Sequence, residues 1–140
     1  MSPDDLGDSP VVIDTDVFSL VVSQRGPYRW YEPYLSGRLW VLSFATVAEL
    51  RYGAGKAGWG AKRREELERR IGLCVVLPGN NAVARNWAEL NQRFASQIGI
   101  NDLWIAATAL AQSPTLPLLT NDQTLDAVGS SFGLTVVRKP

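Results

Sequence analysis

Four acidic residues lie beside short apolar runs at four separate positions along the chain. They are Asp14 in VVIDTD, Glu49 in TVAEL, Asp102 in INDLWIAATAL and Asp122 in LLTND. Carboxylate oxygens are the ligands that Mg²⁺ and Mn²⁺ prefer, and a divalent cation relieves the repulsion between clustered carboxylates. Such a cation also lowers the pKa of a bound water and polarises a phosphoryl oxygen. These residues therefore indicate a metal-dependent nuclease rather than a binding module.

Each acidic residue also has a simpler structural interpretation. Asp14, Asp16, Asp102 and Asp122 could each cap the N-terminus of a helix, and Glu49 could be an exposed helical residue. Capping does not exclude metal binding. The chain contains no histidine, which excludes Ser-His-Asp and Cys-His catalysis and any His-ligated zinc site. The carboxylates are therefore the only catalytic set that the sequence offers.

The composition favours one folded domain. The chain has 140 residues, 46% of them apolar, and its 14 basic residues balance its 14 acidic residues. A nucleic-acid substrate would therefore need local basic residues, and the candidates are Arg25, Arg29, Arg51 and Lys56. The single cysteine, Cys74, fits a reducing cytoplasm. No apolar run reaches the length of a membrane span.

Short apolar runs alternate with helical patterns after residues 1–10, which are expected to form a flexible lead-in rather than a signal peptide or anchor. Strands are expected at 11–13, 39–42, 74–77, 118–119 and 134–137. Helices are expected at 16–23, 28–36, 45–52, 61–71 and 81–97, from Asp102 onward, and as a short element after Asp122. The strand at 74–77 is expected to be buried. This alternation predicts one three-layer α/β domain over residues 11–140, with a mainly parallel sheet.

This architecture would place the four carboxylates at one edge of the sheet. The C-terminal ends of parallel strands and the N-terminal ends of the following helices share an edge, and ligands bind there. Asp14 ends the first strand and Asp122 follows the fourth. Asp102 opens a helix, and Glu49 lies early in another. Their convergence depends on the strand order, which the pattern alone leaves open.

At these motifs the chain resembles PIN-domain ribonucleases, most closely the VapC-type toxins of bacterial and archaeal toxin–antitoxin pairs. The resemblance rests on VIDTDVF, VAELRYG, NDLWIAATALA and LLTND in this order, followed by a short helix and GLTVV. It covers about residues 11–137 and implies a five-stranded sheet of order 3-2-1-4-5 between helices. The opening motif departs from the family at Asp16, where Asn or Ser is usual, and this extra carboxylate could alter the number of metal ions.

The resemblance also implies residue roles and partners. Asp14, Glu49 and Asp102 would bind Mg²⁺ or Mn²⁺, with Asp122 completing the set directly or through water. The residues that would support them or orient the attacking water are Thr15, Asp16, Thr120 and Asn121. The metal-activated water would cleave RNA, which such toxins tend to cut in single-stranded loops. Family members are usually homodimers that a cognate VapB-type antitoxin inhibits.

Two other functions compete with this interpretation. Asp14 and Asp16 also resemble the DxD start of haloacid-dehalogenase-type phosphatases, in which one aspartate is the nucleophile. That family needs a lysine before its last motif, and this chain has none between Lys62 and Lys139. The third possibility is a catalytically inactive PIN-like scaffold that binds protein or RNA, although such scaffolds usually lose acidic residues.

Aromatic residues are concentrated between positions 18 and 40. They include Tyr28, Trp30, Tyr31 and Tyr34. These side chains could pack in the core, or they could line an apolar groove for an antitoxin helix. The sequence leaves both interpretations open.

Overall fold

The apolar runs form a single parallel sheet in the computed structural model, which describes residues 1–140. Its strands are β1 (Val11–Ile13), β2 (Trp40–Ser43), β3 (Val75–Leu77), β4 (Leu118–Leu119) and β5 (Val136–Val137). They lie in the order β3-β2-β1-β4-β5, so the predicted order is confirmed. Val12 of β1 lies opposite both Val41 of β2 and Leu118 of β4. The C-terminal ends of β1 and β4 are therefore side by side.

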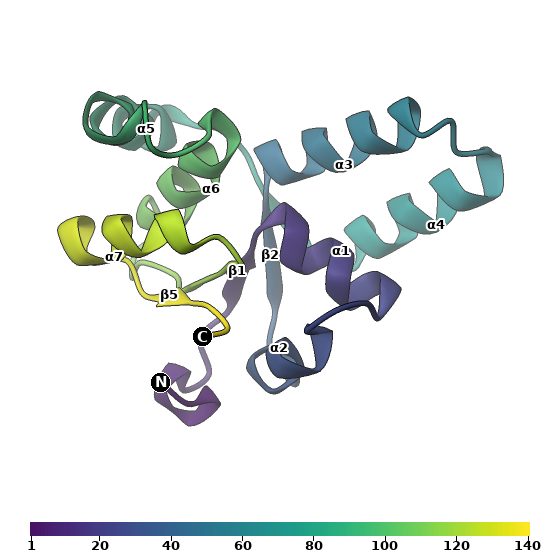
Figure 1. Ribbon diagram of the computed structural model, residues 1–140, viewed down its shortest axis with the longest axis horizontal. Coiled ribbons are helices and arrows are strands. Elements are labelled where there is room, and N and C mark those ends of the chain that lie inside the picture. The colour runs from purple at the N-terminus through teal and green to yellow at the C-terminus, as the bar shows by residue number, and fades with distance from the viewer.

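Helices cover both faces of this sheet. They are α1 (Thr15–Ser23), α2 (Tyr28–Leu35), α3 (Phe44–Lys56), α4 (Ala61–Gly72), α5 (Asn81–Phe94), α6 (Ile100–Leu110) and α7 (Asp126–Phe132), with short 3-10 helices η1 (Pro3–Leu6) and η2 (Gln123–Leu125). Figure 1 shows α1, α2 and α4 on one side of the strands and α5, α6 and α7 on the other. This arrangement is the predicted three-layer α/β domain.

The core has two halves, one on each face of the sheet. Successive side chains of a strand point to opposite faces. Val11 and Ile13 of β1 therefore pack in the half that includes Phe18 of α1. Val12 packs in the other half, with Leu103 of α6. All of these side chains are buried. Burial on both faces explains why the strands are apolar throughout rather than alternating with polar residues.

Helix α3 is longer than the sequence predicts. The sequence predicts a helix over 45–52, before the glycines at 53 and 55, but the helix continues to Lys56. Glycine inside a helix costs about 1 kcal/mol relative to alanine. Ala54, between the two glycines, is buried against the core half that contains Phe18. Tertiary packing therefore outweighs the local propensity.

Two further expectations are wrong. Strand β3 is an edge strand with β2 as its single neighbour, so Val75 and Val76 are 38% and 42% exposed rather than buried. Helix α6 begins at Ile100 with Gly99 as its N-cap. Asp102 therefore lies within the first turn of this helix and does not cap it.

The segment before β1 is attached to the rest of the domain by Arg38. Its guanidinium donates hydrogen bonds to the carbonyl oxygens of Pro3, Gly7 and Ser9, at 2.7, 2.6 and 3.2 Å. The hydroxyl of Tyr34 donates to the carbonyl oxygen of Met1 at 2.8 Å. These contacts hold residues 1–10, which the sequence predicts as a flexible lead-in, against α2 and the start of β2.

Candidate active site

Asp14 lies where β1 ends and α1 begins, and its side chain is 3% exposed. One carboxyl oxygen accepts a hydrogen bond from the backbone N–H of Val17 at 2.8 Å, so Asp14 caps the helix. The other accepts from the hydroxyl of Thr120 at 2.5 Å. Burial raises the pKa of Asp14 to about 6, because the hydrogen bonds from Thr120 and Val17 only partly offset the loss of solvation.

Asp122 lies two residues beyond Thr120, in the turn after β4. Its backbone N–H donates to the Thr120 hydroxyl at 3.0 Å. Its carboxyl accepts from the backbone N–H and the hydroxyl of Thr124, at 2.9 and 2.8 Å, and caps η2. Burial opposes the ionisation of Asp122, but the hydrogen bonds from Thr124, together with Asp102 and the charge of Arg138, lower the pKa. Thr120 therefore joins the carboxyl of Asp14 to the backbone of Asp122.

Glu49 reaches this edge from α3, which follows β2. The hydroxyl of Thr15, the first residue of α1, donates to Glu49 Oε1 at 2.7 Å. The same hydroxyl lies 3.2 Å from that of Thr46, one turn earlier on α3. These contacts join the N-terminal ends of α1 and α3, and they hold Glu49 half-buried on the same side as Asp14.

Asp102 completes the group from the first turn of α6. Its pKa is raised to about 7, first by burial, next by the neighbouring carboxyl of Asp122, with which it can share a proton, and then by the charges of Asp14 and Glu49. The four predicted carboxyls therefore come together from four elements of the fold, and Asp102 experiences the negative charge of all the others. A cation placed among them would be strongly favoured.

The donor set suits Mg²⁺ or Mn²⁺, although the side chains form no closed cage. No three acidic or cysteine side chains lie close enough together to enclose a metal ion without rearrangement. Mg²⁺, however, keeps several of its waters and is usually held by one or two carboxylates directly. An open arrangement of hard oxygen donors therefore fits a hydrated divalent cation better than a fully protein-ligated one.

The two remaining predicted support residues lie at the border of the cluster. Asp16 is exposed in the first turn of α1, and its charge contributes to the raised pKa of Asp14. Asn121 is exposed, and its Oδ1 accepts a hydrogen bond from the hydroxyl of Tyr31 at 3.1 Å. The side chain of Asn121 therefore contacts α2 rather than Asp14.

The four predicted RNA-binding residues form no hydrogen bond or ion pair with the four carboxylates. Arg25 and Arg29 follow the C-terminal end of α1, whereas Asp14 caps its N-terminal end, and nine helical residues span about 13 Å. Arg51 forms an ion pair with Glu68 at 2.7 Å. Lys56 is exposed at the C-terminal end of α3.

Sequence reasoning missed two residues at this site. Tyr31 is fully buried and donates to the carbonyl oxygen of Thr120 at 2.8 Å. Arg138, beyond β5, forms an ion pair with Asp126 at 2.9 Å, and its charge also lowers the pKa of Asp122. The aromatic spacing around Tyr31 could signal a core position but not this contact. Nothing near Arg138 in the sequence points to the site.

This fold and this group of carboxylates define the class of protein. Residues 11–130 match the PIN domain, and the chain belongs to the PIN-domain family. It is similar to Ribonuclease VapC5 of Mycobacterium tuberculosis, with 32% identity over 133 residues that cover 91% of this chain and 93% of that protein. The haloacid-dehalogenase alternative is therefore set aside.

Solved structures have the same architecture. The chain is similar to VapBC-5 of Mycobacterium tuberculosis, a member of the VapBC family of toxin–antitoxin systems, with 27% identity and a TM-score of 0.62 over 94% of this chain and 99% of that one. It is similar to FitAcB of Neisseria gonorrhoeae, with 26% identity and a TM-score of 0.69 over 91% and 96%. VapBC2 of Rickettsia felis, solved with a promoter DNA fragment, shares the fold at 20% identity and a TM-score of 0.74 over 91% and 97%. No helix of this chain is long and apolar enough to cross a membrane.

Proposed function

We propose that this chain is a divalent-metal-dependent endoribonuclease and the toxin of a toxin–antitoxin pair. The observation that carries this proposal is the grouping of Asp14, Glu49 and Asp122 around Asp102, at the edge where β1 and β4 end. The similarity to a ribonuclease at 32% identity supports RNA as the substrate. The chain also resembles a solved structure from a toxin–antitoxin system, which supports its assignment as a toxin.

The four carboxylates would hold the metal, and neighbouring hydroxyls would keep them in place. A bound Mg²⁺ or Mn²⁺ would stabilise charge on the phosphate and lower the pKa of a water. Thr120 holds one oxygen of Asp14, and Thr15 holds one oxygen of Glu49. Glu49 therefore keeps its other oxygen for a ligand. Both oxygens of Asp14 already accept a hydrogen bond, so Asp14 would bind a metal through a remaining lone pair. Asp102 has to lose its proton before it can serve as a ligand.

The RNA backbone requires positive charge close to these carboxylates. Arg138 meets this requirement better than Arg25, Arg29, Arg51 or Lys56, because it is the cation whose charge lowers the pKa of Asp122. Its contact with Asp126 is half-exposed and can be exchanged for a phosphate. We therefore assign the phosphate contact nearest the reacting bond to Arg138.

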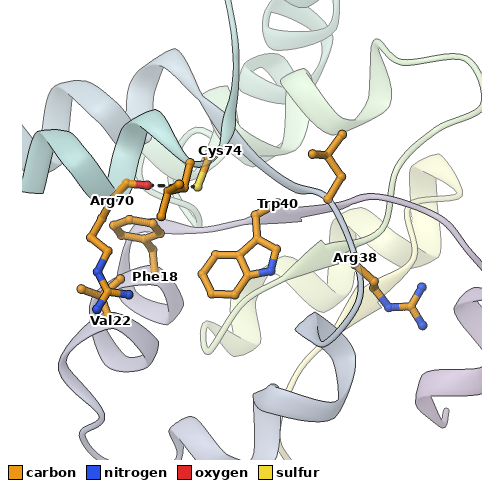
Figure 2. Close-up of a pocket in the computed structure, with 8 residues that line it drawn as sticks. Phe18, Val22, Arg38, Trp40, Arg70 and Cys74 are labelled. Carbon is orange, nitrogen blue, oxygen red and sulfur yellow. Dashed lines mark hydrogen bonds between the residues drawn. The ribbon is translucent and has the colours of Figure 1, made fainter.

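An apolar pocket between α1, α4 and the start of β2 is a suitable site for the antitoxin. The pocket has a volume of about 220 Å³, and its walls include Phe18, Val22 and Trp40, with Arg38 and Arg70 at its border. Figure 2 shows these side chains around the hollow, with Cys74 on the α4 side. Tyr31 and Tyr34 do not line this pocket, so the site that we assign to an apolar antitoxin segment uses α1 and α4 rather than these tyrosines.

The proposal is tested by incubating the purified protein with total RNA in Mg²⁺, Mn²⁺ or EDTA. The variants Asp14→Asn and Asp102→Asn remove one carboxylate each with little change in shape. Asp8→Asn serves as the control, because Asp8 is an exposed carboxylate in the N-terminal segment. We expect wild-type protein and Asp8→Asn to cut RNA at discrete positions when metal is present. Asp14→Asn and Asp102→Asn should make no cuts. Folded wild-type protein that binds RNA but cuts none under any condition would instead support the scaffold alternative.

A further inference from the structure

Tyr31 connects α2 to the turn that carries Thr120 and Asp122. Its side chain is fully buried, and its hydroxyl lies 2.8 Å from the carbonyl oxygen of Thr120 and 3.1 Å from Oδ1 of Asn121. The backbone N–H of Lys139 donates to the same hydroxyl at 3.3 Å. One phenol therefore links α2, the end of β4 and the C-terminal segment after β5.

The peptide group of Thr120 depends on this phenol. Thr120 is fully buried, and its backbone N–H donates to the carbonyl oxygen of Val137 at 3.0 Å. Its own carbonyl oxygen accepts from the Tyr31 hydroxyl and from no backbone N–H. Buried carbonyl groups are nearly always paired, so the Tyr31 hydroxyl helps to fix the orientation of the 120–121 peptide.

The orientation of the 120–121 peptide matters because the contacts on either side of it hold Asp14 and Asp122 in place. The side chain of Thr120 holds Asp14, and the next peptide, 121–122, supplies the N–H of Asp122 that binds the Thr120 hydroxyl. The hydroxyl of Tyr31 also remains a donor, because burial raises the pKa of the phenol and Lys139 occupies one of its lone pairs. A rotation of the 120–121 peptide would therefore move Asp14 and Asp122 relative to each other.

We propose that Tyr31 is a positioning residue of the active site, which fixes Thr120 and Asp122 through the carbonyl group of Thr120. This inference rests on the proposed function, since it assigns Tyr31 to the geometry of the same carboxylates. Tyr31 forms hydrogen bonds with Thr120, Asn121 and Lys139 and with none of the four carboxylates, so its effect is indirect. Partners that hold metal ligands from behind typically change activity or metal affinity by about 10- to 100-fold when they are removed.

The protein provides a matched control in Tyr34. Both tyrosines are buried in α2, and each donates its hydroxyl to a backbone carbonyl oxygen at 2.8 Å. The acceptor for Tyr34 is Met1, which belongs to the N-terminal segment rather than to the site. The variants Tyr31→Phe and Tyr34→Phe therefore remove the same atom and the same hydrogen bond to a backbone carbonyl oxygen, which leads to the site only for Tyr31. Tyr31→Phe also removes the contacts with Asn121 and Lys139.

The experiment measures kcat and KM for RNA cleavage, Mn²⁺ binding by calorimetry without RNA, and the backbone amide NMR signals of Asn121 and Asp122. For Tyr31→Phe we expect kcat and Mn²⁺ affinity to fall by about 10- to 100-fold with KM unchanged, and both amide signals to shift. For Tyr34→Phe we expect wild-type values, although both variants lose thermal stability. Equal effects of the two variants, or unchanged Mn²⁺ affinity and amide signals in Tyr31→Phe, would overturn the inference.

The two proposals fail in different ways. Wild-type protein that cuts no RNA in Mg²⁺ or Mn²⁺ would remove the proposed function, whatever the variants do. Mn²⁺ binding and the amide signals would still decide whether Tyr31 positions the turn. Active wild-type protein with an equally active Tyr31→Phe variant would remove the role of Tyr31 and leave the proposed function standing.

Discussion

The hydroxyl of Thr120 donates a hydrogen bond to the buried carboxyl of Asp14 across 106 positions of sequence. Its direction is fixed by a second contact. The backbone N–H of Asp122 can only donate, and it points at the same hydroxyl oxygen, so the hydroxyl proton faces Asp14. A hydrogen bond of this kind favours the charged carboxylate and opposes the effect of burial on its pKa.

Replacing Thr120 with valine should therefore weaken the site at two points. Thr120→Val leaves Asp14 without its side-chain donor and the N–H of Asp122 without its acceptor, so the pKa of Asp14 should rise above about 6. We expect cleavage to fall by about 10- to 100-fold and stability to fall by about 1–3 kcal/mol. Steady-state kinetics and urea unfolding measure these two effects.

Thr108→Val is the control for that substitution. Thr108 is also fully buried, and its hydroxyl contacts the carbonyl oxygen of Trp104 and the hydroxyl of Ser43. This variant should lose comparable stability and retain its cleavage rate. Equal losses of activity in the two valine variants would show that Thr120 contributes through general stability alone.

The stability of the metal-free protein should fall as the pH rises toward neutrality. The pKa values of Asp14 and Asp102 are raised from 3.8 to about 6 and about 7. Between these values the folded protein binds more protons than the unfolded chain, so deprotonation costs stability in this window. For Asp14 the difference corresponds to about 3 kcal/mol. Thermal unfolding in EDTA at a series of pH values from about 4 to about 8 would measure this trend.

The same measurement in Mg²⁺ separates this effect from other titrations. The ion competes with protons for the carboxylates, so it should raise the melting temperature more at the upper end of this pH range than at the lower end. Asp102→Asn should make the EDTA curve flatter and stabilise the metal-free protein near neutral pH. A melting temperature that increases with pH in EDTA would contradict the raised pKa values.

Antitoxin binding should depend on the pocket between α1 and α4. Val22 is half-buried and lines this pocket. A charged side chain there would have to enter an apolar site, so Val22→Glu should reduce affinity for the antitoxin by at least about tenfold. RNA cleavage should not change, because Val22 lies near the end of α1 opposite to Asp14. Calorimetric titration with the antitoxin tests the affinity, and wild-type binding by Val22→Glu would place the antitoxin elsewhere.

Substrate affinity should depend on Arg138 more than on the basic residues that the sequence suggests. Arg138→Gln should raise KM for RNA and make it less sensitive to salt, because one phosphate contact is lost. Arg25→Gln, beyond the far end of α1, should leave KM and its salt dependence unchanged. The decisive measurement is KM at several salt concentrations for both variants. A larger effect of Arg25 would reverse the assignment.

The sequence predicts the positions of the strands well, and it predicts their order and exposure less well. Each apolar run is a strand, because residues such as Val11 and Ile13 are buried on one face and Val12 on the other. The strand order came from the family resemblance, since alternating strands and helices are compatible with several orders. The exposure of β3 depends on the absence of a second neighbouring strand, which the run CVVL cannot indicate.

The residues of the site divide in the same way, into those that local sequence predicts and those that depend on tertiary contacts. Asp14, Glu49, Asp102 and Asp122 could be selected because each follows or opens an element at one edge of the sheet. The contact of Tyr31 with Thr120 spans 89 positions, and no local sequence pattern predicts it. The sequence could not show which of the basic candidates are already paired, because the neighbours of a charged side chain depend on tertiary structure. Arg51, for example, is paired with Glu68 of the adjacent helix.

The exposed strand β3 also bears on how this protein behaves at high concentration. An uncovered edge with apolar side chains is a template on which another polypeptide can add a strand and begin to aggregate. Here the template is three residues long and ends at Pro78, which has no N–H to offer an incoming chain. Leu73, 68% exposed just before it, adds to the apolar character of the same border. Pro78 thus limits aggregation at this edge. Its replacement by a β-branched residue would lengthen the exposed strand by one residue and favour fibrous association.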